Sequence, residues 1–302
     1  MKFINKKTKF IISFSKNHTP KKSIIKKANL FIIGAQKCGT STLFDNLIKH
    51  DSIYGGEIKE KNFFSHESLF EKGVDWYHDL FPKVSFFHKL PKINYFLDAS
   101  PSYLSHKEAA DKIYKYNPRA KFIVMMRNPV DRAFSAWNMY RQMNFLDDAE
   151  KKILFEMHVK GSSIDRENQF TNFINLNSYP SFDKMIQDEL NYFSIDSSRF
   201  PGILSRGIYY NQIEYYMSLF DSSQFFFIFA EEFKVNKTLI LAELMLFLNL
   251  QRGLSNYALT DTHVREYNHK MLPETRVKLL DFFSPYNEKL FALIGKKTNW
   301  SK

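Results

Sequence analysis

Residues 30–44, LFIIGAQKCGTSTLF, constrain the fold of this chain more than any other segment. The apolar run LFII is typical of a buried parallel strand, and it leads into a turn bounded by Gly34 and Gly39. Hydroxyl residues at 40–42 then open a segment whose apolar residues follow helical spacing. A strand, a tight loop and a helix N-terminus in this order direct backbone N–H groups and the helix dipole at one point. The segment therefore predicts an anion site for a phosphate-bearing ligand.

The loop is close to the P-loop pattern, G-x-x-x-x-G-K-[ST], but its lysine has moved. Thr40 stands at the lysine position, and Lys37 lies inside the loop. A P-loop lysine reaches the β- and γ-phosphates, whereas Lys37 on the crown of the loop would meet a shorter phosphate group. Asp98 is the candidate for a strand-end Mg²⁺ ligand, but polar residues interrupt the run before it. A P-loop small-molecule kinase is therefore disfavoured and stays an alternative.

Strands and helices alternate along the chain. Buried strands are predicted at 30–33, 94–98, 121–126 and 225–229, a polar turn at 51–61, and helices at 107–116, 129–140, 181–193, 209–220, 238–249 and 274–294, the last as a pair or one broken helix. This order predicts an α/β fold with a P-loop-like parallel central sheet and helices on both faces. Ligands of such sheets bind at the carboxyl ends of the strands.

Residues 1–29 are predicted to form a basic, flexible arm, and 30–302 a single domain with a polar excursion at 144–178. Nine lysines and no acidic residue lie in 1–30, so nine of the eleven net positive charges belong to the arm. The charge of the arm favours weak contact with anionic membranes, and specific nucleic-acid binding is not expected. The single cysteine fits a reducing compartment. Without a signal peptide or transmembrane run, the protein is expected in the cytoplasm.

A second motif, RNPVDRAFSAW at 127–137, follows the predicted strand 121–126. Arg127 at the strand end can grip a phosphate through two hydrogen bonds, and Ser135 can add a third. Arg132 is a competing candidate for the guanidinium.

The two motifs together resemble the cofactor-binding motifs of PAPS-dependent sulfotransferases, most closely the carbohydrate branch with the heparan sulfate N- and 3-O-sulfotransferase domains. Similarity continues through KEKNFF (59–64), GVDWYHDLFP (73–82), SRGIYYNQIEYY (205–216) and the C-terminal 276–295, and covers roughly residues 30–300. The resemblance implies transfer of a sulfuryl group from PAPS (3′-phosphoadenosine 5′-phosphosulfate) to a hydroxyl or amine of a carbohydrate-like acceptor. It also implies in-line displacement without a metal and release of PAP, adenosine 3′,5′-bisphosphate. A non-enzymatic nucleotide- or anion-binding module is the other alternative.

The resemblance also implies roles for single residues. The implied cofactor-binding residues are Lys37, Cys38, Gly39, Thr40, Ser41, Thr42, Arg127, Ser135, Tyr209, Arg265, Asn268 and Lys270. Lys37 would also donate to the oxygen that bridges phosphorus and sulfur, and Glu60 of KEKNFF would be the catalytic base. His66 and His106 are rival bases. The expected acceptor-binding residues are Lys59, Asp98, Ser100 and Tyr103.

Overall fold

The computed structural model describes residues 27–56, 58–81, 95–158, 170–171, 173–193, 202–250, 259 and 269–301. The structural statements below concern these residues. The predicted arm lies almost entirely outside them, as do Arg265 and Asn268 of the expected cofactor loop.

Within the described residues, five parallel strands form one sheet in the order β2-β3-β1-β4-β5. The strands are β1 Leu30–Gly34, β2 Ile53–Gly55, β3 Tyr95–Ala99, β4 Lys121–Met126 and β5 Phe225–Phe229. Every residue of β1 is buried, as its continuous apolar run predicts for a central parallel strand. Ile32 of β1 pairs with Ala99 on one side and Ile123 on the other, so three strands end at the same edge.

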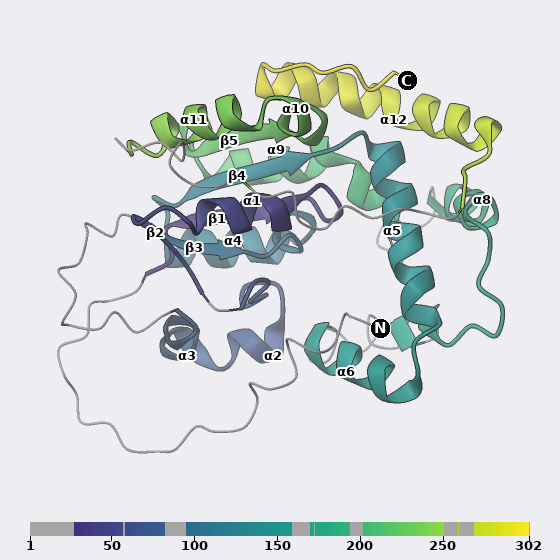
Figure 1. Cartoon of the computed structure of the whole chain (residues 1–302), viewed down its shortest axis with the longest axis horizontal. Coiled ribbons are helices and arrows are strands. Elements are labelled where there is room, and N and C mark those ends of the chain that lie inside the picture. Colours follow the sequence, from purple (N-terminus) through teal and green to yellow (C-terminus); the bar gives the residue numbers. More distant parts are fainter. Residues whose placement is uncertain are drawn as a thin grey trace.

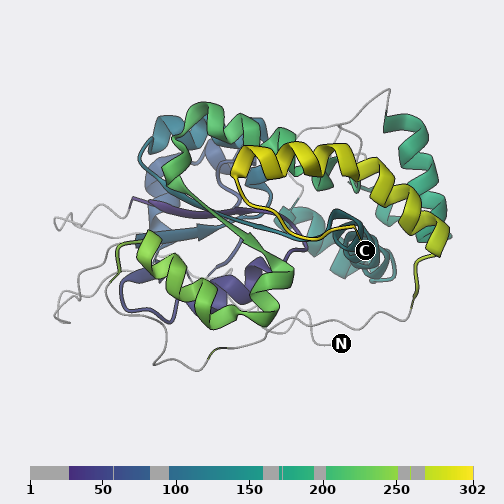
Figure 2. The same ribbon diagram turned by 90° about the horizontal axis from the view of Figure 1, so that it is seen from above.

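Helices cover both faces of this sheet (Figures 1 and 2). They are α1 Thr40–Leu47, α2 Glu67–Phe70, α3 Gly73–Asp79, α4 Lys107–Tyr116, α5 Pro129–Asn144, α6 Asp148–His158, α8 Phe182–Phe193, α9 Tyr209–Leu219, α10 Ala230–Val235, α11 Lys237–Phe247 and α12 Pro273–Ile294. Helices α4, α9 and α12 lie on one face, and α1, α10 and α11 on the other.

The side chains of strand β5 pack against helices on both faces of the sheet. Its side chains alternate across the sheet, so Phe229 packs against Phe291 of α12 while Phe226 packs against Phe247 of α11. Aromatic residues therefore fill both layers. Helix α5 leaves the carboxyl edge of the sheet and extends away from it toward α6 (Figure 1).

The predicted parallel sheet with helices on both faces is confirmed. Strand β2 was missed, because Ile53–Gly55 lies in the stretch predicted as a polar turn. The excursion at 144–178 is more regular than expected, since α6 occupies Asp148–His158. The C-terminal segment is one helix, α12, that runs through Pro285.

In the described part of the chain, we find no helix with the length and apolar character needed to cross a membrane.

Candidate active site

The loop between β1 and α1 is shaped by two glycines. Gly39 has a φ of 93°, and a Cβ there would lie 3.2 Å from the terminal methyl of Met125. A Cβ on Gly34 would lie 2.6 Å from Cβ of Leu104, which is too close for any side chain. The N–H of Ala35 donates to the carbonyl oxygen of Met125 at 2.7 Å and ties the loop to β4. Glycine is thus required at both ends of the loop for it to pass between its neighbours.

Helix α1 begins at Thr40 directly after this loop, and Gly39 as the N-cap offers no side-chain hydrogen bond to its first turn. The first N–H groups of a helix lack intrahelical partners, and they carry the positive end of the helix dipole. Lys37 lies on the loop in a left-handed conformation, with a φ of 70°. The first turn of α1 and Lys37 therefore belong to the short segment where the sequence predicted an anion site.

The second half of the site follows β4, the strand beside β1. Asn128 caps α5: its Oδ1 accepts a hydrogen bond from the N–H of Val130 at 3.0 Å. The N–H of Asn128 in turn donates to Oε1 of Glu231 at 2.8 Å. These bonds fix the backbone on the C-terminal side of Arg127. Ser135 lies on α5 and is buried.

Tyr209 at the start of α9 joins the two halves. Its buried hydroxyl donates to the carbonyl oxygen of Arg127 at 2.9 Å and lies 3.5 Å from Sγ of Cys38. Burial raises the pKa of the Cys38 thiol to about 11, and the hydrogen bond with Tyr209 and the charge of Arg132 only partly oppose this. Cys38 is therefore a neutral packing residue of the loop. A second tie joins Nη1 of Arg206 to Oε1 of Gln36 at 3.2 Å.

The segment that carries Glu60 is attached to the carboxyl end of β3. The N–H of Glu60 donates to the carbonyl oxygen of Ala99 at 2.9 Å, and the N–H of Asn62 donates to Oγ of Ser100 at 3.1 Å. Glu60 therefore belongs to the same edge of the sheet as residues 34–42, which we call the anion loop. Its carboxylate lies 2.8 Å from Nζ of Lys59, and its side chain is 37% exposed. A carboxylate in this position is accessible to a substrate.

Asp98 is the centre of a buried hydrogen-bond network. Its carboxylate accepts hydrogen bonds from the hydroxyls of Tyr77 at 2.8 Å, Ser100 at 2.7 Å and Tyr103 at 2.8 Å. Tyr77 comes from α3, so the network holds α3 against β3. Asp98, Ser100 and Tyr103 are fully buried, and direct contact with an acceptor would require the network to open. Their expected contact with the acceptor stays a prediction.

Residues 27–276 match the family model described as "Sulfotransferase domain". The chain belongs to the sulfotransferase family. It is 24% identical over 289 residues to heparan sulfate glucosamine 3-O-sulfotransferase 5 of Mus musculus, which covers 89% of this chain and 72% of the relative. It is 23% identical over 319 residues to the membrane-associated sulfotransferase kil1 of Dictyostelium discoideum, covering 90% of this chain and 66% of the relative. The crystal structure of a sulfotransferase from Alicyclobacillus acidocaldarius matches with a TM-score of 0.63 and 27% identity, over 91% of this chain and 99% of that one.

The other predicted site residues of this sulfotransferase differ in how far they are exposed to solvent. Lys270 is exposed, and Tyr209 is buried, so its ring offers no open face for stacking on a base. Of the rival bases, His66 is buried, and Nδ1 of His106 lies 2.6 Å from the carbonyl oxygen of Ser102. Within the described segments, no group of three or more His, Cys, Asp or Glu residues could hold a metal.

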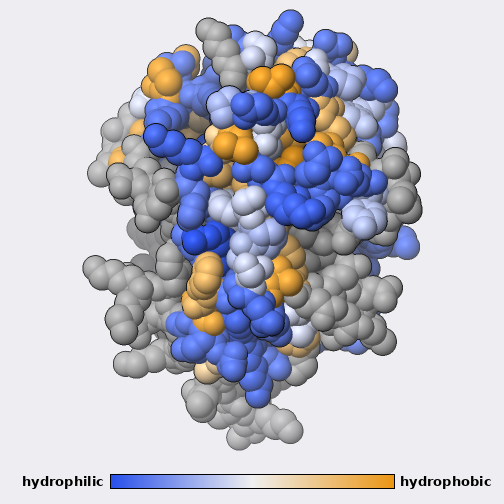
Figure 3. All heavy atoms as spheres, turned by 90° about the vertical axis from the view of Figure 1, so that its right-hand side faces the viewer, coloured by the Kyte–Doolittle hydropathy of each residue, from blue (hydrophilic) through white to orange (hydrophobic). Residues whose placement is uncertain are grey.

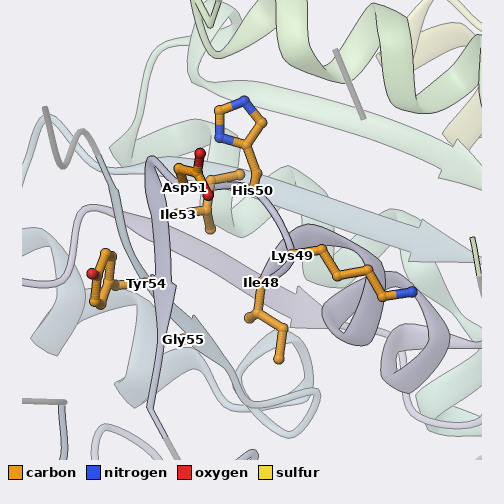
Figure 4. A pocket seen from close by; sticks show the side chains of 7 residues that line it. All are labelled: Ile48, Lys49, His50, Asp51, Ile53, Tyr54 and Gly55. Carbon is orange, nitrogen blue, oxygen red and sulfur yellow. The ribbon is translucent and has the colours of Figure 1, made fainter. Parts of the chain in front are cut away.

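A shallow depression of about 350 Å³ lies away from this site (Figure 4). Its lining residues are Ile48, Lys49, His50, Asp51, Ile53, Tyr54 and Gly55. They follow the C-terminal end of α1, whereas the anion loop precedes its N-terminal end. Lys49, His50 and Tyr54 point away from one another and do not converge on a ligand position.

The sequence did not predict that Arg206 would contact the anion loop. The residue lies in SRGIYY, a segment that supported the family resemblance without a role for its arginine. Its hydrogen bond to Gln36 joins segments 170 residues apart in sequence, and no local pattern predicts such a contact.

Proposed function

We propose that this sulfotransferase uses PAPS as donor and modifies a hydroxyl or amine of a carbohydrate-like acceptor. The observation that carries the proposal is that two segments predicted to bind anions lie at one edge of the sheet. The anion loop, residues 34–42, and the Arg127–Ser135 segment are bridged by the hydroxyl of Tyr209. PAPS has one phosphate on the 5′ side, next to the sulfuryl group, and another at the 3′ position. Two separate phosphate sites suit such a ligand.

The residues have distinct tasks in this proposal. The first-turn N–H groups of α1 bind the 5′-phosphate, and Arg127 with Ser135 binds the 3′-phosphate. The donor supplies a sulfuryl group, whose bond to the bridging phosphate oxygen breaks as the acceptor oxygen or nitrogen bonds to sulfur. Lys37 donates to the bridging oxygen, where negative charge develops. Glu60 takes the proton from the acceptor.

The nature of the acceptor is supported by the relatives and by the surface. The mouse relative is named for heparan sulfate glucosamine, a sugar acceptor. The side of the molecule that carries α8 and the beginning of α12 is largely hydrophilic, with smaller apolar patches between the polar groups (Figure 3). A surface of this kind suits a hydroxylated acceptor better than a lipid. The cytoplasmic location and the membrane contact of the arm stay predictions.

Calorimetric titration in magnesium-free buffer tests the donor. We expect PAP to bind more tightly than adenosine 5′-monophosphate, because only PAP carries the 3′-phosphate. Binding of Mg²⁺–ATP with no preference for a 3′-phosphate would instead support a kinase and contradict the proposal. Incubation with sulfate-labelled PAPS and a panel of oligosaccharides then tests the acceptor, and label on peptides or lipids alone would contradict a carbohydrate.

A further inference from the structure

Arg132 on α5 carries a guanidinium that is closed off from solvent, with an exposed fraction of 0%. Its Nη2 donates to the carbonyl oxygen of Ile203. Its Nε and Nη1 are buried and have no hydrogen-bond partner in the described part of the protein. The ion pairs found among the described residues do not include Arg132.

This arrangement is costly without a counter-charge. Arginine keeps its proton at any pH a folded protein tolerates, so burial cannot neutralise it. A buried charge without a partner is strongly unfavourable, and buried charges are normally paired. The described residues thus give the Arg132 guanidinium one carbonyl partner and no ion pair, and an anionic ligand is the natural candidate for its counter-ion.

Arg132 is close to both halves of the anion site. Ser135 follows it by three residues on α5, so the two lie on neighbouring positions of one helix face. Burial raises the pKa of Cys38 to about 11 and that of Tyr209 well above its ordinary value, and the charge of Arg132 lowers both. For Cys38 this effect of Arg132 exceeds that of Arg127. The field of Arg132 therefore reaches the anion loop and the Tyr209 bridge.

We infer that Arg132 is a positioning residue whose counter-ion is the 3′-phosphate of the donor, bound at Arg127 and Ser135. The inference rests on the proposed function. Arg132 needs no direct contact with the phosphate, because charges interact strongly across a poorly polarisable interior. The Arg132 charge then destabilises the empty protein and stabilises the complex with the donor.

Arg132→Met tests this, because it removes the charge and keeps most of the volume. The empty variant is expected to unfold at about the same temperature as the wild type, because removing an unpaired buried charge offsets the loss of the donor to the Ile203 carbonyl oxygen. Its affinity for PAP in magnesium-free buffer should fall about tenfold or more. Affinity for adenosine 5′-monophosphate, which lacks the 3′-phosphate, should change little. The rise in unfolding temperature caused by PAP should shrink accordingly.

Two further variants sharpen the result. Arg132→Lys keeps the charge and should retain most of the preference for PAP over adenosine 5′-monophosphate. Arg141→Met removes a partly exposed arginine of the same helix, which lies over the ring of Phe145, and should leave that preference unchanged.

Three outcomes would overturn the inference. An Arg132→Met protein that is much less stable when empty or fails to fold would assign Arg132 a purely structural role. An unchanged preference for PAP in that variant would remove the link to the 3′-phosphate while leaving the proposed function intact. Failure of the wild type to bind PAP would reject both the inference and the proposed function.

Discussion

The hydroxyl of Tyr209 donates a hydrogen bond to the carbonyl oxygen of Arg127 at 2.9 Å. Tyr209 opens α9, and Arg127 follows β4, so one bond sets the end of the sheet against the helix that packs beside it. The same hydroxyl lies 3.5 Å from Sγ of Cys38 in the anion loop. The Tyr209 hydroxyl therefore links the anion loop to the end of β4 beside the contacts made by Ala35 and Arg206.

Tyr209→Phe is expected to weaken PAP binding about three- to tenfold and to lower the free energy of unfolding by about 1–3 kcal/mol, because it leaves a buried carbonyl oxygen unpaired. Titration calorimetry and urea denaturation measure the two effects. Tyr216→Phe on the same helix is the control, since its hydroxyl donates to the carbonyl oxygen of Tyr103 at 3.1 Å, away from Arg127. Tyr216→Phe should lose stability and keep PAP affinity. Equal affinity losses in both variants would contradict a specific role for Tyr209.

Gly39→Ala is expected to destabilise the protein by about 1–3 kcal/mol, through its positive φ and the approach to Met125, and to reduce PAP affinity. Gly73→Ala is the matched control, because Gly73 has a φ of 84° and a Cβ added there would meet nothing within 4 Å. Gly73→Ala should lose only the stability that an alanine loses at a positive φ. Denaturation curves and PAP titrations on both variants separate strain from damage to the loop, and normal PAP binding by Gly39→Ala would contradict the loop's role.

The sequence could predict the anion loop and most of the sheet because their signals are local. Residues 30–44 contain the strand, both glycines and the start of the helix in one continuous run. Strand β2 was not predicted because it is three residues long and lies within a polar stretch. Its formation depends on pairing with β3. Short strands of this kind are decided by tertiary contacts, which periodicity does not report.

The burial of polar groups could not be predicted. Asp98 was expected to contact the acceptor, but hydroxyls from α3 and from the turn after β3 surround its carboxylate. Arg127 and Arg132 belong to one motif and have the same side chain. Only the fold distinguishes them, because Arg132 is closed off from solvent and Arg127 is half-buried.

Glu60→Gln is expected to reduce kcat about 10²–10⁴-fold, because a neutral amide cannot accept the acceptor proton. The Kd for PAP should stay within about twofold, since removing a half-exposed ion pair with Lys59 has little effect on folding. Initial rates with sulfate-labelled donor and PAP titrations provide the two values. Glu67→Gln, which removes an exposed carboxylate paired with Lys112, is the control and should retain full activity. Unchanged turnover in Glu60→Gln would exclude Glu60 as the base.

Lys37→Ala is expected to lower kcat about 10²–10³-fold, because a donor to the developing negative charge is lost. The variant keeps a Cβ and should fold normally, which thermal unfolding can verify. Lys49→Ala, beyond the opposite end of α1, is the control for the loss of one positive charge. A similar decrease in kcat for both variants would indicate a general effect of charge instead of a donor at the bridging oxygen.

Cys38 provides a pH test of the loop, because burial raises the pKa of its thiol from the ordinary value of 9.0 to about 11. The unfolded chain releases the thiol proton near pH 9, whereas the folded chain holds it until about pH 11. The free energy of unfolding of the wild type should therefore fall relative to that of Cys38→Ser as pH rises from about 9 to about 11, by up to about 3 kcal/mol. Below about pH 9 the unfolding free energies of the two proteins should change with pH in the same way. Urea denaturation at a series of pH values measures this. At about pH 8 the native thiol should react with a disulfide reagent only as fast as the protein opens, and rapid modification of the folded protein would show that Cys38 is accessible and contradict its packing role.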